Sequence, residues 1–141
     1  MFRQREDGSE LEKDFIKKQI QQLVLALQRV LHLAKEEQRH DAAEDALQAA
    51  ARAALKLDLK FLSSVSPDSC AVILGSGEKL RSYARIVATQ SQLLHLRGQE
   101  SASRELLLRA LKLHEAALRL SPPSEDDRLA MASLRAQLSA H

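Results

Sequence analysis

Residues 35–43 (KEEQRHDAA) and residues 96–103 (LRGQESAS) each contain the end of one predicted helix and the start of the next. On both sides of these polar stretches, apolar residues recur every three or four positions, which is the period of an α-helix. A small residue follows each turn, with a leucine four positions later and an alanine seven positions later. These residues are Ala43, Leu47 and Ala50 after the first turn, and Ser103, Leu107 and Ala110 after the second. The shared order predicts two antiparallel helical hairpins.

The same period extends over most of the 141 residues and predicts a single all-α domain. We expect about five main helices and short connector helices. The predicted segments are a flexible N-terminus (1–9), a first hairpin (10–56), a connector (57–77), a second hairpin (78–121) and a C-terminal capping helix (124–139).

The first helix is expected to run from about Leu11 to Gln38, with an apolar stripe that Val24, Leu25, Leu31 and Leu33 make too wide for one face. We therefore expect two sides of it to be covered, one by its hairpin partner and one by a later helix or another copy of the chain. The second helix is expected to begin at Asp41, with Glu44 completing a capping box. Its many alanines favour a place at the closely packed centre, and the high helix propensity of alanine is a second explanation that is compatible with the first.

Further along the chain, several residues mark helix ends. Ser66 and Pro67 are typical of a helix start, Gly98 is typical of a helix end, and Ser124 with Asp127 predicts a cap for the last helix.

The composition excludes several classes of protein. The net charge of +2 is too small to indicate nucleic-acid binding by itself, and one cysteine, Cys70, cannot form an intramolecular disulfide. We expect Cys70 to pack as a small apolar residue. The N-terminus has no apolar signal core and no apolar run approaches bilayer length, so we expect a cytoplasmic protein that does not bind membranes.

The two hairpins resemble tetratricopeptide-type repeats, in which small residues let two antiparallel helices cross closely while large residues fill the gaps. Val87, Ser91, Leu94, Ser103, Leu107 and Ala110 match that alternation of sizes in the second hairpin, and Leu27, Ala34, Ala43, Leu47 and Ala50 match it in the first. Leu31 departs from it, because the pattern has a small residue there. The resemblance implies a scaffold that binds other molecules.

The chain is also similar to an uncharacterised bacterial family of small all-helical proteins. The run Asp14-Phe15-Ile16, which opens into a long helix, carries this resemblance together with the order of hairpin, connector and hairpin. It implies an all-helical fold and a bacterial cytoplasmic setting, and it implies no activity.

No sequence motif indicates catalysis. Residues 75–79 (GSGEK) lack the glycine spacing and the final hydroxyl of a phosphate-binding loop. His32, Glu36 and His40 would share one face of a continuous helix, but the helix is expected to end near Gln38, which would turn His40 away. We therefore predict no metal, no cofactor and no enzymatic activity.

The tetratricopeptide resemblance implies a ligand groove along the first helix of each hairpin. The residues on those lines are Gln28, His32 and Lys35 in the first hairpin, and Arg85, Gln92 and His95 in the second. Such a groove would be polar and mildly basic, which suits an acidic peptide or a chain terminus. The alternative is an ordinary solvated helix face.

The leading hypothesis is a non-catalytic, helical-repeat-like protein–protein interaction module that forms a homodimer. Dimerisation is expected because an isologous contact would bury the wide apolar stripe of the first helix. The alternative is a helical protein that binds nucleic acid through Arg81, Arg85, Arg97, Arg104 and Arg109.

Overall fold

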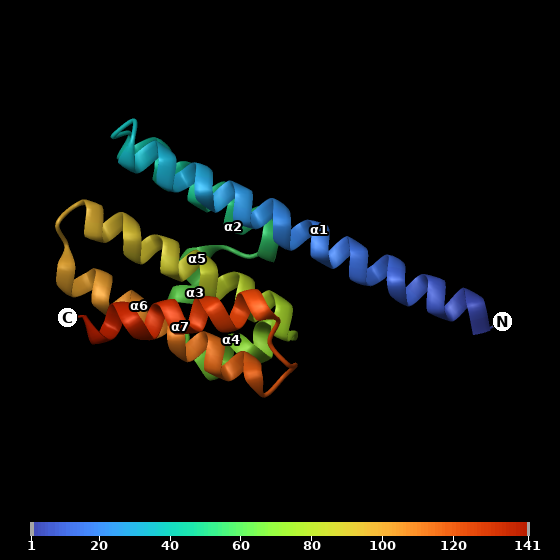
Figure 1. Ribbon diagram of the computed structural model, residues 1–141. Helices are drawn as coiled ribbons and strands as arrows, with labels where there is room; N and C mark the ends of the chain where they lie inside the picture. The colour runs from blue at the N-terminus through green and yellow to red at the C-terminus, as the bar shows by residue number, and fades with distance from the viewer. Residues whose placement is uncertain (1, 141) are drawn as a thin grey trace.

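The computed structural model describes residues 2–140, with side chains from residue 11 onward. Within this range the chain forms seven helices and no strand, which confirms the predicted all-α class (Figure 1). The helices are α1 (Phe2–Lys35), α2 (His40–Leu55), α3 (Leu59–Ser63), α4 (Pro67–Leu74), α5 (Gly77–Leu96), α6 (Glu100–Leu118) and α7 (Glu125–Ser139). None of these helices is both long enough and apolar enough to cross a membrane.

The helix α5 is the centre of the packing. It lies against α1, α2, α4 and α6, while α1 also packs on α2, and α7 packs on α6. Leu80, Ala84, Ile86 and Val87 of α5 are completely or almost completely buried. The expected cover on two sides of the first helix is therefore confirmed, with α2 and α5 providing it.

The alanine-rich helix α2 does not form the centre, so that expectation is wrong. Its buried residues are Ala43, Leu47, Ala51 and Leu55, whereas Ala49 and Ala53 are exposed. The buried residues recur every four positions and so form a single stripe facing the rest of the molecule. For the exposed alanines, helix propensity is the better explanation.

Two serines allow α5 and α6 to approach each other closely. The Oγ of Ser91 donates to the carbonyl of Ser103 at 2.6 Å, and the Oγ of Ser103 donates to the carbonyl of Ser91 at 2.8 Å. Both side chains are buried, and these reciprocal bonds satisfy their hydroxyl groups. The small residues of the second hairpin thus lie at the crossing of its two helices.

The predicted ends of the first hairpin helices need correction. The helix α1 begins at Phe2 and ends at Lys35, not at Leu11 and Gln38, and Gln38 has a positive φ of 54° that helical geometry does not allow. The second helix begins at His40, and its N-cap, Arg39, makes no side-chain capping bond. Asp41 lies in the first turn, so it forms no capping box with Glu44.

The other predicted helix signals are confirmed. Ser66 caps α4 with Pro67 in the first turn, and Gly98 adopts a left-handed φ of 78° after α5. Ser124 and Asp127 form a complete capping box at α7. Met131 and Leu134 form the buried face of α7 together with the half-buried Ala130 and Leu138.

Arg109 fastens the connector to α6. Its Nη2 donates to the carbonyls of Leu62 and Val65 at 2.8 and 2.9 Å, and lies 3.1 Å from the hydroxyl of Tyr83. Cys70 is buried beside it, which confirms its expected packing. Burial raises the pKa of the Cys70 thiol, and the charge of Arg109 opposes that shift only in part. One guanidinium therefore satisfies two carbonyls where the chain leaves α3.

We expect Arg109→Met to lower the free energy of unfolding by about 2 kcal/mol, because the two carbonyls lose their charged donor. Urea unfolding of the variant and the wild type measures this difference. Arg119→Met is the control, because the Arg119 ion pair with Asp68 is highly exposed. The control should stay within about 0.5 kcal/mol of wild type. Equal stability of all three proteins would contradict the role given to Arg109.

Candidate functional site

A groove lies between α1 and α7, with α5 contributing to its lining. It consists of two adjoining hollows that share Val24, Arg85 and Ala130, and we call the pair the α1–α7 groove. The inner hollow has a volume of about 200 Å³ and its polar lining is Arg85, Thr89, Gln92, His114, Ser133 and Gln137. The outer hollow has a volume of about 740 Å³ and is mostly apolar, with Leu25 and Leu129 among its lining residues.

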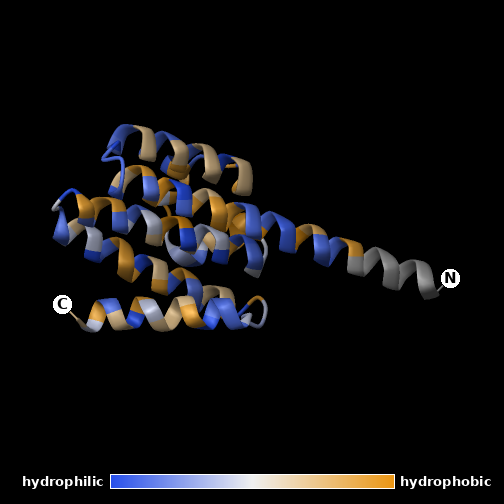
Figure 2. Cartoon of the chain, turned by 45° about the horizontal axis from the view of Figure 1, so that its top comes forward, coloured by the Kyte–Doolittle hydropathy of each residue, from blue (hydrophilic) through white to orange (hydrophobic). Residues whose placement is uncertain are grey.

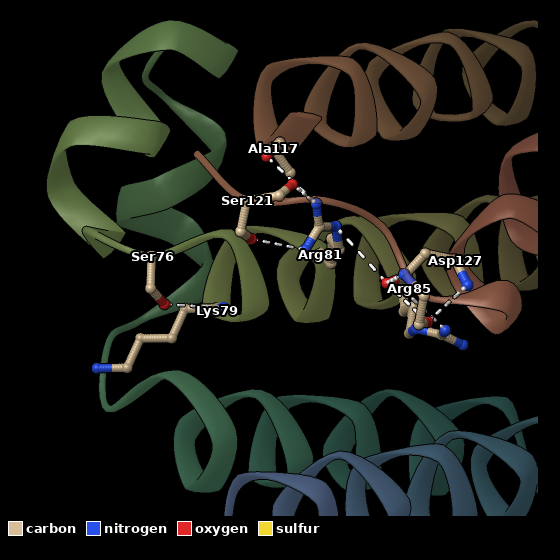
Figure 3. A network of polar contacts seen from close by, with 8 residues as sticks. Ser76, Lys79, Arg81, Arg85, Ala117, Ser121 and Asp127 are labelled. Atoms are coloured by element: carbon tan, nitrogen blue, oxygen red, sulfur yellow. Dashed lines mark hydrogen bonds and ion pairs between the residues drawn. The ribbon is translucent and has the colours of Figure 1, made fainter. Parts of the chain in front are cut away.

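The ion pairs of Asp127 connect α7 to α5 beside this groove (Figure 3). Its Oδ2 lies 3.7 Å from Nε of Arg81, and its Oδ1 lies 3.3 Å from Nη2 of Arg85. Burial raises the pKa of the Asp127 carboxyl, but hydrogen bonds from Ser124 and Arg85 outweigh burial and hold this pKa below its usual value. The carboxylate of Asp127 thus pairs with two guanidinium groups, and a second carboxylate, Asp126, lines the outer hollow together with Arg85.

The two arginines differ in what else they contact. Arg81 is buried and also donates to Oγ of Ser121 at 2.9 Å and to the carbonyls of Ala117 and Ser121 (Figure 3). The side chain of Arg85 is one-fifth exposed and lines both hollows of the groove. Arg85 is therefore the positive group that a ligand in the groove would meet.

His114 contributes a buried, uncharged imidazole to the inner hollow. Only 1% of its surface is exposed, and its Nδ1 has no hydrogen-bond partner among the described residues. Burial lowers the pKa of His114 to about 4, and the positive charge of Arg85 adds to this effect. The ring is therefore neutral at pH 7.

The structure brings together two of the six predicted groove residues. Arg85 and Gln92 both line the inner hollow. His95 lies outside both hollows, where it is exposed and pairs with Glu100 at 2.7 Å. The remaining three, Gln28, His32 and Lys35, are exposed on α1 and line neither hollow.

Sequence reasoning missed the other lining residues. Leu25 was part of the wide apolar stripe, but the sequence did not say which helix would lie beside it. Ser133 and Gln137 lie on α7, which the sequence indicated only as a cap. His114 carried no signal, because a single histidine in an amphipathic helix indicates nothing by itself.

The other groupings considered from the sequence do not form sites in the described part of the chain. No three residues among its His, Cys, Asp and Glu side chains are placed to hold a metal ion. The helix α1 ends at Lys35, so Glu36 and His40 do not continue the face of His32.

The five arginines proposed for nucleic-acid binding each contact an acceptor of their own chain. Arg81 and Arg85 pair with Asp127, Arg97 pairs with Glu44, and Arg104 and Arg109 donate to backbone carbonyls. These intramolecular contacts weaken the case for a free basic face.

Comparisons with known proteins found no counterpart for this chain. No protein-family model, no curated protein sequence and no solved structure matched it.

We expect wild-type stability to fall by up to about 3 kcal/mol as the pH drops from 6.5 to about 4, because of His114. In this window the unfolded chain binds a proton at this histidine and the folded chain does not, so acid favours unfolding. Urea unfolding at neutral pH and at a pH of about 4 measures the loss of stability. His114→Gln should remove most of this slope, and a variant that kept the full slope would contradict the assignment.

Proposed function

We propose that this protein is a non-catalytic interaction module that binds a polypeptide segment carrying an acidic group in the α1–α7 groove. The observation that supports it most directly is the position of Arg85. This arginine lies where the two hollows join, and it shares the carboxylate of Asp127 with Arg81. A carboxylate from a partner would make a charge-assisted contact with the exposed part of Arg85, on the side away from Asp126.

The rest of the groove suits an amphipathic peptide. Leu25 and Leu129 are 64% and 59% exposed, an unfavourable arrangement that apolar side chains of a partner would relieve. Gln92 and Gln137 can each donate to and accept from a peptide backbone in the inner hollow. The proposed ligand thus places an acidic group at Arg85, apolar groups on the outer hollow and its backbone on the glutamines.

A tetratricopeptide-like scaffold is part of this proposal. Its support is that α1 and α5, the first helices of the two hairpins, both line the groove, and that small side chains meet where α5 and α6 cross. The resemblance to the bacterial family supports a cytoplasmic setting. Nucleic-acid binding is not proposed, because the arginines that suggested it already have partners within the chain.

The test is selection of peptides from a random display library against the purified wild-type protein, followed by calorimetry on the selected peptides. We expect enrichment of sequences that combine an acidic group with apolar residues. Arg85→Ala should weaken binding by at least about tenfold, the cost of one charge-assisted contact. Ser133→Phe should also weaken it, because Ser133 is exposed at the surface of the inner hollow and a larger side chain would fill the space.

His95→Ala is the matched control, since His95 is a basic residue on the same helix but outside the groove. This variant should bind as the wild type does. Selection of peptides without acidic groups, or equal affinity of Arg85→Ala and wild type, would contradict the proposal.

A further inference from the structure

Four helices surround the inner hollow of the α1–α7 groove. The helices α1, α5 and α7 supply most of its lining, and α6 supplies His114. Only 1% of the surface of His114 is exposed, and its Nδ1 has no hydrogen-bond partner among the described residues. A buried polar atom without a partner costs free energy. A ligand that reaches this nitrogen would therefore gain a hydrogen bond that the folded chain leaves unmade.

Arg85 keeps free N–H groups beside the same hollow. Among the described residues, its guanidinium makes one hydrogen bond, from Nη2 to Oδ1 of Asp127 at 3.3 Å. A guanidinium has five N–H groups, so several remain for a ligand. The hollow has a volume of only about 200 Å³. A small group bound in it would consequently lie close to both Arg85 and His114.

The charges around the inner hollow favour a ligand group with one negative charge. Arg85 is the only charged residue among its described lining residues, because His114 is neutral at pH 7. The carboxylate of Asp126 lines the outer hollow instead, so a group in the inner hollow meets Arg85 from the other side. Asp127 already neutralises part of the charge of Arg85. A phosphate group, with a charge of about −2, would therefore be balanced less well than a carboxylate.

The inner hollow also has an apolar part, which suits the carbon atoms next to a carboxylate. Apolar and polar residues alternate along the helices around it (Figure 2). Its apolar lining residues are Val24, Leu27, Ala88, Ala130 and Leu134. Aliphatic carbons that pack against these side chains would leave water, which is favourable. Pockets for drug-sized ligands begin at roughly 300 Å³, so only a short aliphatic group fits here.

We propose that the inner hollow binds a single carboxylate on a short aliphatic group, with Arg85 as its ion-pair partner and Nδ1 of His114 as a second hydrogen-bond donor. This inference rests on the proposed function, because it names the place where the acidic group of the partner binds. His114 determines specificity there, since a neutral imidazole with its proton on Nδ1 donates one hydrogen bond and adds no charge. The carboxylate of an acidic side chain and that of a chain terminus share this chemistry.

Butyrate is the probe for this site, and butyramide is its uncharged control of nearly equal size. Titration of the wild-type protein at millimolar butyrate should shift the NMR signals of the His114 ring to saturation. Butyramide and inorganic phosphate should not shift them. Arg85→Ala should lower the affinity for butyrate by at least about tenfold, because the ion pair is lost. Unchanged His114 signals, or equal binding of butyramide or phosphate, would overturn the proposal.

Two variants of His114 separate its hydrogen bond from its packing. His114→Asn places an amide N–H near the position of Nδ1 and should bind butyrate within about threefold of the wild type. His114→Leu keeps only an apolar side chain and should bind butyrate at least about tenfold more weakly. Circular dichroism shows whether both variants retain their helices. Equal affinity of His114→Leu and wild type would contradict the role given to His114.

Competition relates this site to the proposed function. Peptides selected from the display library should displace butyrate. Amidation of the peptide C-terminus, or replacement of the acidic residue by the matching amide, identifies the carboxylate that enters the hollow, because only that change should weaken binding. Butyrate binding without any selected peptide would contradict the proposed function and leave the carboxylate site standing. Peptides that bind without displacing butyrate would overturn this inference and leave the proposed function standing.

Discussion

The buried guanidinium of Arg81 is the constraint on which the groove side of this molecule depends. A charge placed inside the central helix α5 costs several kcal/mol unless an opposite charge and hydrogen-bond acceptors surround it. Asp127 supplies the charge, while Ala117 and Ser121 supply acceptors, so the end of α6, the link that follows it and the start of α7 are all drawn to one place on α5. Gly77 contributes to this arrangement, because a side chain there would collide with Ser121. The groove follows, since its α7 wall is fixed by the same contact that holds Arg85.

Much of the helical framework could be predicted from residues close to each other in the sequence. Ser124 and Asp127 show where that information ends. Their three-residue spacing predicted a helix cap, and they form one. The second role of Asp127, as partner of Arg81 and Arg85, joins residues more than forty positions apart, and no periodic pattern encodes such a pair. Asp41 had an equally good local pattern and does not cap its helix, because α2 begins one residue earlier.

The candidate site was only partly predictable for the same reason. Arg85 and Gln92 were found because they lie two turns apart on one helix, a relation that the sequence displays directly. Gln28, His32 and Lys35, the α1 residues predicted with them, are exposed towards the C-terminal end of α1 and line neither hollow, because which part of α1 faces α7 is decided by contacts between residues far apart in the sequence. Leu25 belonged to a stripe that was recognised as too wide, yet the sequence could not distinguish a neighbouring helix from a second chain as its cover. The structure leaves Leu25 exposed beside α7.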